Sequence, residues 1–231
     1  MAVIFYGDSH SDAFYDTYNE NSNEQSYRVD FLEIAPTMYS IGFNKMNKLN
    51  YKKLSQYVKI RQCKDGVSIT MNVDDLIKEG DTVVMSCGEV DARCHIMKHS
   101  NDLSYDSDIE NIVKNYIEVI LMNIKQFNNL KVLICSVPPT INGKYKNKKR
   151  PLLGTPELRK TYTNCLNKYL KKYCKIHEIP FLDIHDLFTD ENGYLNNKYK
   201  DKTNHIRSGI NDSDTKNIIW NKIKDFFKET C

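Results

Sequence analysis

Short apolar runs alternate with longer amphipathic segments along this chain, an arrangement that predicts strands followed by helices. The apolar runs, rich in β-branched and aromatic residues, predict strands within residues 3–6, 31–43, 81–87, 131–137 and 179–184. Apolar residues recur at helical spacing in the segments 106–127, 155–173 and 212–227. This alternation favours a parallel sheet with helices covering both faces.

Capping and turn residues predict where several of these elements begin and end. Thr155 and Pro156 mark a helix start, as the N-cap and a first-turn residue. The first long helix carries apolar residues at helical spacing that are expected to face inward: Ile109, Ile112, Val113, Tyr116, Ile117, Ile120, Leu121 and Ile124. The second is expected to bury Leu158, Tyr162, Leu166, Tyr169, Leu170 and Tyr173. The remaining segments are interpreted as a helix end with a surface loop (15–28), a strand end with a glycine turn (40–44) and two helices (46–58 and 68–78), the second ending at Gly80.

Composition narrows the class of protein. The chain has 231 residues, of which 40% are hydrophobic, and shows no repeat or linker, so a single domain over 1–231 is expected. A net charge of +3 gives no reason to expect nucleic acid as a partner. No apolar run approaches 18 residues and no signal peptide is recognisable, so a cytoplasmic protein without a membrane span is expected. The seven cysteines show no CxxC pairing, which favours reduced thiols.

The N-terminal stretch organises the candidate chemistry. The first predicted strand ends at Gly7-Asp8-Ser9, and polar helix-starting residues follow it. This places the Ser9 hydroxyl at the carboxyl edge of the sheet, where open α/β sheets bind ligands. The adjoining helix start offers free N–H groups that favour negative charge, as an ester-cleaving serine requires. The alternative is an ordinary capped turn between a strand and a helix.

Three more segments with polar residues could meet Ser9 at the same edge. They are Gly42, residues 88–93 and residues 201–205, the last of which contains Asp201 and His205. A serine, a histidine and a carboxylate brought together there would form a nucleophile, a base and a group that orients the base.

These segments together resemble the SGNH (GDSL-type) hydrolase superfamily over nearly the whole chain. The first family block matches Gly7-Asp8-Ser9, the second matches Gly42, the third falls on residues 88–91 and the last on residues 201–205. Val137-Pro138-Pro139 is a further similarity. The resemblance implies a three-layer α/β/α, flavodoxin-like fold with about five parallel strands in the order 2-1-3-4-5. It also implies a catalytic Ser9 and His205, with Asp201 orienting the histidine and Gly42 lining the oxyanion hole.

Two blocks depart from the family pattern. Val90 stands where the family has an asparagine that donates a hydrogen bond, within a Gly-Glu-Val-Asp-Ala-Arg segment similar to a branch with Gly-Glu-Ile-Asp-Cys-Arg. Arg93, held by Glu89 or Asp91, is predicted to line the Ser9 pocket and to stabilise charge or clamp an anionic substrate. The alternative is a Glu89–Arg93 pair that only stiffens the loop.

In the last block, Asp201 lies four residues before His205 rather than three, and Lys202 occupies the family's aspartate position. A one-residue bulge could restore the geometry. Ser9 and His205 would also work as a dyad without Asp201.

Other chemistry is less well supported by the sequence. Cys94, His95 and His99 could suggest a metal, but a zinc site needs three or four converging ligands, so neither a metal nor a cofactor is expected. The basic residues within 144–150 are interpreted as a solvated loop, with attraction of an acidic substrate as the alternative.

The sequence thus predicts a serine esterase that removes an O-acyl group, such as O-acetyl, from a glycan or a small acceptor. An O-acyltransferase using the same Ser-His site is one alternative, and a glycan-binding or accessory module that has lost hydrolysis is another. The sequence does not define the oligomeric state.

Overall fold

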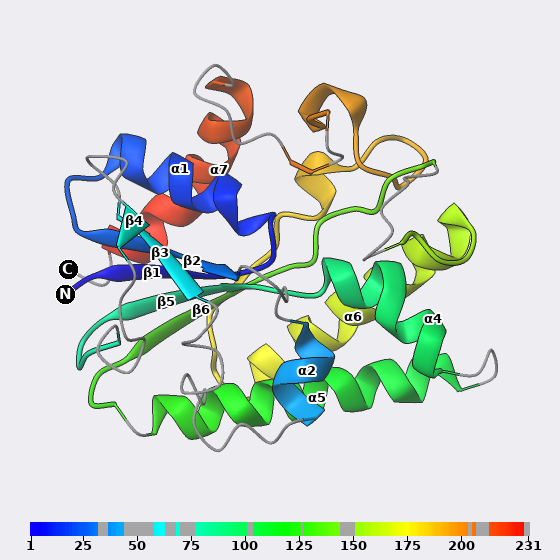
Figure 1. Cartoon of the computed structure of the whole chain (residues 1–231), viewed down its shortest axis with the longest axis horizontal. Helices are drawn as coiled ribbons and strands as arrows, with labels where there is room; N and C mark the ends of the chain where they lie inside the picture. Colours follow the sequence, from blue (N-terminus) through cyan, green and yellow to red (C-terminus); the bar gives the residue numbers. More distant parts are fainter. Residues whose placement is uncertain are drawn as a thin grey trace.

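The computed structural model describes residues 1–31, 37–43, 58–62, 68–69, 77–100, 104–125, 127–143, 151–202, 205–206 and 213–228. A seven-stranded sheet with the order β4-β3-β2-β1-β5-β6-β7 forms its centre, with helices on both faces (Figure 1).

Five of the strands run parallel, the number that the sequence predicts, although the second lies, except for Phe31, before the predicted range of 31–43. They are β2 (Ser26–Phe31), β1 (Val3–Gly7), β5 (Thr82–Ser86), β6 (Lys131–Cys135) and β7 (Phe181–Leu182). Counted along the chain, their spatial order is 2-1-3-4-5, so the predicted order and the central first strand are confirmed.

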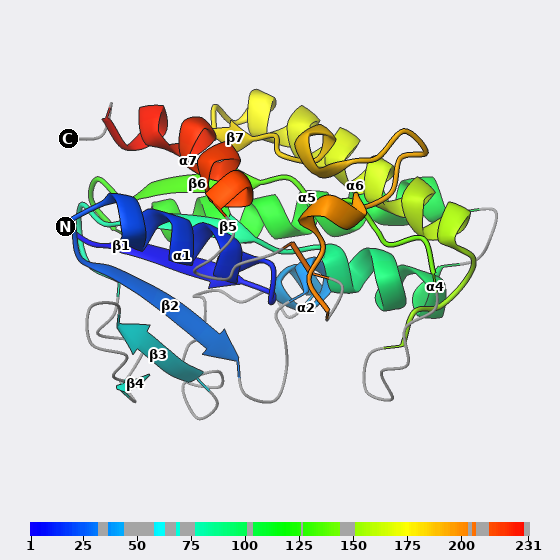
Figure 2. The ribbon, with the colours of Figure 1, turned by 90° about the horizontal axis from the view of Figure 1, so that it is seen from above.

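The edge beyond β2 differs from the prediction. Here β3 (Val58–Gln62) pairs antiparallel with β2, and β4 (Ser68–Ile69) pairs antiparallel with β3 (Figure 2). The helix expected over 68–78 is wrong for all of its described residues, because Ser68 and Ile69 pair with β3 and residues 77–78 are not helical. The helix expected over 46–58 lies outside the described residues up to 57, and Val58 already belongs to β3.

The helices form two layers, one on each face of the sheet. Helices α1 (Ser11–Asn21) and α7 (Ser213–Lys228) cover one face. Helices α5 (Tyr105–Ile124) and α6 (Pro156–Ile176) cover the other, together with the short α2 (Met38–Phe43) and α4 (Ile96–His99) (Figure 1). This is the expected three-layer α/β/α arrangement.

Alternating side chains of β1 divide the hydrophobic core in two. Val3 and Phe5 belong to the cluster under α1 and α7, whereas Ile4 and Tyr6 belong to the cluster under α5 and α6. Successive strand residues point to opposite faces, so a strand between two helical layers must be apolar at every position. This explains why β1 reads as an uninterrupted apolar run.

The predicted faces of the long helices are confirmed. Thr155 caps α6 by accepting a hydrogen bond from Leu158 N–H. Of the inward residues expected from periodicity, nine are buried: Ile109, Val113, Tyr116, Ile117, Ile120, Tyr162, Leu166, Tyr169 and Leu170. The other five are partly buried and pack against the same cluster: Ile112, Leu121, Ile124, Leu158 and Tyr173. The cysteines at 87, 94, 135, 165 and 174 are free thiols and buried.

Two local interpretations between β1 and β3 are wrong. Residues 26–28, expected to lie in a loop, begin β2, because they pair with β1 in the order Val3↔Ser26 and Ile4↔Tyr27. Residues 40–43, expected to be a strand end and a turn, lie within α2. At the start of α2, Thr37 Oγ1 accepts a hydrogen bond from Ser40 N–H, and Asp91, far along the chain, accepts one from Met38 N–H.

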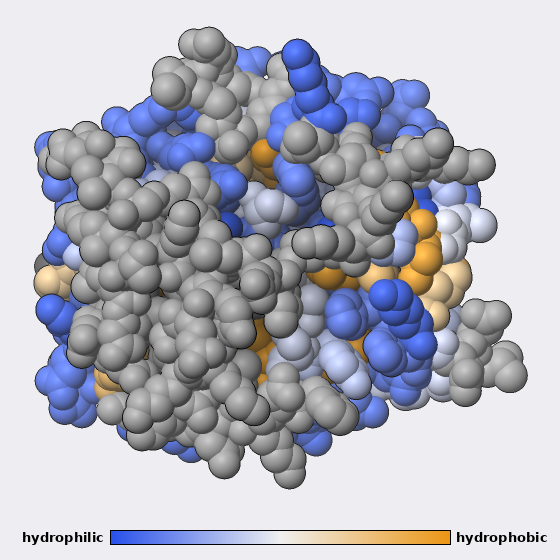
Figure 3. All heavy atoms as spheres, in the orientation of Figure 1, coloured by the Kyte–Doolittle hydropathy of each residue, from blue (hydrophilic) through white to orange (hydrophobic). Residues whose placement is uncertain are grey.

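The described surface is mainly polar. Figure 3 shows largely hydrophilic residues among the described atoms of one face, and the large apolar residues exposed in the described ranges are Met1, Met122 and Ile176. No helix within those ranges has the length and apolar character needed to cross a membrane.

Gly7 provides a test of how closely β1 and β5 approach each other. A Cβ atom at Gly7 would lie 2.0 Å from the Ser86 carbonyl oxygen. Gly7→Ala must therefore push the two central strands apart, and we expect it to lower the free energy of unfolding by at least about 3 kcal/mol. Urea denaturation followed by circular dichroism measures this change.

Gly143→Ala is the matched control, because a Cβ there would meet nothing within 4 Å. It should change stability by less than about 0.5 kcal/mol. Equal stability of the two variants would contradict the close approach of β1 and β5.

Candidate active site

The turn between β1 and α1 presents Ser9 at the carboxyl edge of the sheet. Ser9 is exposed, and its Oγ lies 2.8 Å from Nε2 of His205. The two residues are 196 positions apart in sequence. The approach to hydrogen-bond distance predicted from the sequence is therefore present, and it pairs a hydroxyl with an imidazole nitrogen able to accept its proton.

Asp8 anchors this turn from inside the protein. It is 2% exposed, and its main-chain N–H donates to the Ser86 carbonyl at 2.9 Å. Its carboxylate accepts hydrogen bonds from His10 N–H at Oδ1 (3.0 Å) and from Glu89 N–H at Oδ2 (3.3 Å). Burial, with the nearby Glu89 carboxylate, raises the pKa of Asp8 to about 7. Asp8 thus links the serine turn to the segment that follows β5.

The loop that carries His205 is closed by Asp201. Asp201 Oδ1 accepts a hydrogen bond from the His205 main-chain N–H at 2.8 Å, and Asp201 N–H donates to the His205 carbonyl at 2.9 Å. Asp201 therefore holds the backbone of His205, and its action on the imidazole ring stays a prediction.

His10, which the sequence analysis left without a role, packs directly against His205. The two rings meet edge to face with their centroids 4.8 Å apart. His10 is 2% exposed, and its Nδ1 accepts a hydrogen bond from Ile206 N–H at 3.4 Å. Burial, helped by the charges of His205 and Arg93, lowers the pKa of His10 well below its usual range. A neutral ring thus supports His205 from the serine turn itself.

The segment after β5 brings Glu89 and Arg93 close to this turn. Gly88 has a φ of +121°, and the chain then enters a π-helical turn over Asp91–His95. Arg93 Nη2 lies 3.1 Å from Glu89 Oε2, and both side chains are mostly buried. Because Glu89 N–H also binds Asp8, this ion pair lies beside the serine turn. The prediction that Glu89 holds Arg93 is confirmed.

Asp91 does not take the expected part in this group. It is 0% exposed, and its carboxylate accepts hydrogen bonds from Met38 N–H (2.8 Å) and Tyr39 N–H (3.1 Å), where α2 starts. Burial raises its pKa to about 6. A fully enclosed carboxylate that caps a helix cannot contact a substrate, so the expectation of a substrate-binding Asp91 is corrected.

Gly42 is also placed differently from the expectation. It lies within α2 rather than in a turn after a strand. A role for the Gly42 N–H in an oxyanion hole stays a prediction.

Arg159, whose role was not anticipated from the sequence, binds the main chain of two segments, residues 141–143 and residues 153–154. It is 2% exposed, and its guanidinium donates to the main-chain carbonyls of Ile141, Gly143, Leu153 and Gly154. Leu153 N–H in turn donates to the Arg93 carbonyl at 3.0 Å. An arginine one turn into a predicted helix is commonly exposed, so no local signal identified this role.

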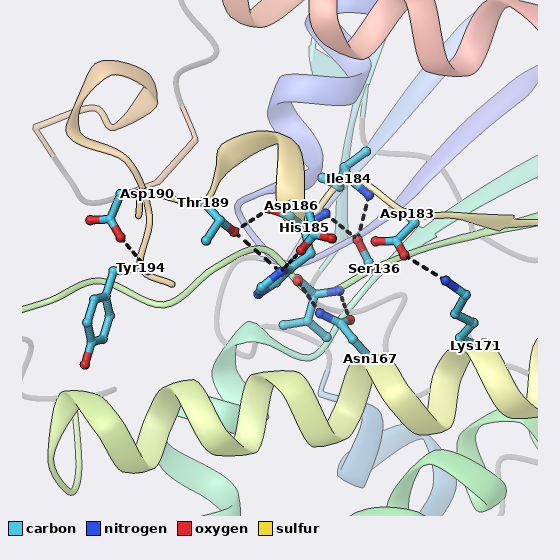
Figure 4. A network of polar contacts seen from close by, with 11 residues as sticks. Ser136, Asn167, Lys171, Asp183, Ile184, His185, Asp186, Thr189, Asp190 and Tyr194 are labelled. Atoms are coloured by element: carbon cyan, nitrogen blue, oxygen red, sulfur yellow. Dashed lines mark hydrogen bonds and ion pairs between the residues drawn. The ribbon is translucent and has the colours of Figure 1, made fainter. Parts of the chain in front are cut away.

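A polar network fixes the chain beyond β6 and β7 (Figure 4). Ser136 Oγ accepts hydrogen bonds from Ile184 N–H and His185 N–H. Asn167 on α6 bonds to both the N–H and the carbonyl of Val137. These contacts connect the ends of β6 and β7 to α6, and so stabilise the edge of the sheet next to the candidate site.

The histidines once considered as metal ligands have another arrangement. The rings of Tyr39, His95 and His99 stack on one another, with centroids 5.2–5.8 Å apart. Within the described part of the chain, no group of three or more ligating side chains could hold a metal ion. Tyr39 and His99 also line a pocket of about 300 Å³ between α2, α4 and α5. Among the described residues, neither Ser9 nor His205 lines this pocket.

No protein-family model matches this sequence, and no curated protein matches it. Solved structures do match. One is a GDSL-like lipase from Bacteroides thetaiotaomicron, with 17% identity, a TM-score of 0.56, and coverage of 100% of this chain and 89% of that one.

Two further matches agree with the first. A member of the lipolytic G-D-S-L family from Veillonella parvula has 13% identity and a TM-score of 0.53, covering 99% of this chain and 98% of that one. An acetyl xylan esterase has 17% identity and a TM-score of 0.51, covering 96% and 98%. The chain has the α/β/α fold of the SGNH (GDSL-type) hydrolases.

The raised pKa of Asp8 predicts a pH-dependent stability. The folded protein binds the Asp8 proton more readily than the unfolded chain does, so this group's stabilising contribution is complete below the unfolded value of 3.8 and is lost as pH rises through about 7. Asp8→Asn cannot ionise, so its free energy of unfolding should fall less steeply between pH 4 and 8. At about 1.36 kcal/mol per pKa unit, the difference from wild type should change by roughly a few kcal/mol.

Urea denaturation at a series of pH values measures this difference. Asp186→Asn serves as the control, because that side chain is 95% exposed. A difference between Asp8→Asn and wild type that is constant over the whole pH range would contradict a proton held by Asp8.

Proposed function

We propose that this protein is a serine esterase of the SGNH type, which removes an O-acyl group from a glycan or small-molecule ester. The observation that carries the proposal is the 2.8 Å contact between Ser9 Oγ and His205 Nε2, at the carboxyl edge of the sheet. An exposed serine hydroxyl bonded to an imidazole is the arrangement that activates a nucleophile.

The reaction follows from these two groups. Ser9 Oγ attacks the acyl carbon, and its proton passes to His205 Nε2. The protonated His205 then gives that proton to the oxygen of the departing alcohol as its bond to the acyl carbon breaks. Water attacks the acyl group on Ser9 and loses a proton to His205, which returns it to Ser9 Oγ as the carboxylic acid leaves.

Negative charge on the acyl oxygen needs hydrogen-bond donors in a fixed position. Ser9 N–H is one candidate, because among the described residues no acceptor takes its hydrogen bond. Val90 cannot donate from its side chain. Arg93 is the second candidate, because its partner Glu89 is bonded to Asp8 and its charge acts on His10.

The neighbouring proteins guide the choice of substrate. One of the similar structures is an acetyl xylan esterase, which fits an O-acetylated glycan as the class of substrate to test first. The exposure of Ser9 would also let an alcohol approach the acyl-enzyme in place of water. An O-acyltransferase with the same first half-reaction is therefore the second candidate function.

Labelling with a fluorophosphonate probe tests whether Ser9 is an activated nucleophile. Wild type should be labelled and Ser9→Ala should lose labelling completely, because the bond forms at Ser9 Oγ. His205→Ala should slow labelling by at least roughly 100-fold, since it removes the base. Mass spectrometry of the labelled peptide identifies the site.

Ser107→Ala on α5 is the matched control and should be labelled like wild type. A folded wild-type protein that resists the probe would contradict the esterase proposal and favour a binding module. If labelling occurs, the products formed from p-nitrophenyl acetate with and without an added alcohol separate hydrolysis from transfer.

The role proposed for Arg93 can be measured with the same ester. Arg93→Ala should reduce kcat by roughly 100-fold, the effect of losing one oxyanion donor. Arg93→Lys should recover part of the loss, because lysine retains the charge but not the planar fork. Thermal denaturation of each variant supplies the fraction of folded protein.

A purely structural Arg93 would give a different result. The variants would then melt at lower temperature while keeping the wild-type kcat per folded molecule. That outcome would leave stabilisation of the oxyanion to main-chain N–H groups.

A further inference from the structure

Arg28 lies beneath the serine turn and has no part in the reaction described above. It comes from β2, is 3% exposed, and is 20 positions away in sequence from Asp8. Its Nη2 donates to the Asp8 main-chain carbonyl at 2.9 Å, and its Nε donates to Asp12 Oδ1 at 3.0 Å. A third donor, Nη1, bonds to the Val29 carbonyl. One guanidinium thus joins β2, the serine turn and the first turn of α1.

The Asp8 carbonyl is the point where these contacts converge. Besides Arg28, it accepts hydrogen bonds from Ser11 N–H (3.1 Å) and Ser11 Oγ (2.6 Å). This carbonyl belongs to the peptide bond that leads directly into Ser9. Any shift of the carbonyl therefore moves the Ser9 N–H, and with it the height of the nucleophile above the sheet.

We propose that Arg28 is a positioning residue for Ser9, which sets the place of the nucleophile and its N–H by holding the Asp8 peptide from below. The inference rests on the proposed function, since it assigns Arg28 to the same Ser9 site. The planar guanidinium suits this role because its donors point in fixed directions toward three elements.

Energetic considerations agree with a role beyond folding. Enclosing a guanidinium such as that of Arg28, whose partner Asp12 is only partly buried, carries a desolvation cost that an apolar side chain of similar size would avoid. Arg28 is therefore less favourable for stability at this position than an apolar residue would be. Its guanidinium can, however, donate to the Asp8 carbonyl and interact with the Asp8 carboxylate.

The charge of Arg28 also reaches the Asp8 carboxylate. Glu89 raises the pKa of Asp8 and Arg28 lowers it, so Arg28 favours the ionised form. In that form both oxygens can accept, one from His10 N–H and the other from Glu89 N–H. The titratable and charged groups around Asp8 are Arg28, Asp12, Glu89, Cys87 and His10. Loss of the Arg28 charge should let Asp8 take up a proton at higher pH and lose one acceptor.

The test compares the rate of fluorophosphonate labelling of wild type, Arg28→Lys and Arg28→Met between pH 5 and 9. Arg28→Met should be labelled roughly 100-fold more slowly at its best pH, the scale expected for a displaced nucleophile. In a plot of labelling rate against pH, the decline of the rate on the acid side (the acid limb) should also lie at higher pH for Arg28→Met than for wild type. Arg28→Lys should keep the acid limb near the wild-type position and recover only part of the rate.

Lys216→Met is the matched control. Lys216 is also a buried cation, 6% exposed and paired with Glu20 between α7 and α1, but among the described residues no hydrogen bond or ion pair links it to the serine turn. It should lower the melting temperature and leave labelling per folded molecule unchanged. The double variant Asp8→Asn/Arg28→Met should show the same acid limb as Asp8→Asn, because the group that responds to the Arg28 charge is then absent.

The outcomes separate the two proposals. Wild type that is not labelled contradicts the esterase itself. The role of Arg28 is overturned if wild type is labelled and Arg28→Met, after correction for folded protein, is labelled at the same rate with the same pH dependence. A slower rate with an unshifted limb and no recovery in Arg28→Lys would make Arg28 structural and would likewise overturn the inference.

Discussion

The close approach of β1 to β5 at Gly7 and Asp8 is the constraint on which the candidate site depends. Gly7 leaves no space for a side chain against the Ser86 carbonyl, and Asp8 N–H bonds to that same carbonyl. The Asp8 carboxylate then binds the N–H of Glu89, where the chain leaves β5. The positions of Ser9 and of the Glu89–Arg93 pair are thus set by a single contact between two central strands.

Several charges are enclosed around this contact, and their enclosure carries a cost in desolvation. Asp8, Arg28 and Arg93 are each less than a tenth exposed, and Glu89 is close to them. Burial raises the pKa of Asp8, while Arg28 acts in the opposite direction. Such groups are costly to desolvate, and proteins often concentrate them where charge develops during a reaction. Burial keeps His10 neutral, so the ring that packs on His205 brings no further positive charge to it.

Much of the fold could be predicted because its signals are local. A strand enclosed between two helical layers must be apolar throughout, so β1, β5 and β6 are evident as apolar runs, and the long helices show their buried faces through periodicity. The carboxyl ends of parallel strands meet at one edge, so the meeting of Ser9 with the His205 segment followed from the alternation of strands and helices. The antiparallel strands β3 and β4 were missed because they are short and lie at an edge, where their pairing depends on neighbours.

The sequence by itself determined the layered α/β architecture, the strand order and the two residues that face each other in the candidate site. Only the tertiary structure decided the roles of the buried charges. Asp91 caps a helix that begins 53 residues earlier, Arg28 holds a carbonyl 20 residues away, and Asp201 binds the backbone of His205. Gly42 belongs to a helix whose first N–H groups bind Asp91 as well as the nearby Thr37. Spacing along a chain reports which face of an element a residue occupies, whereas the partner of a polar group is fixed by which elements the fold brings together.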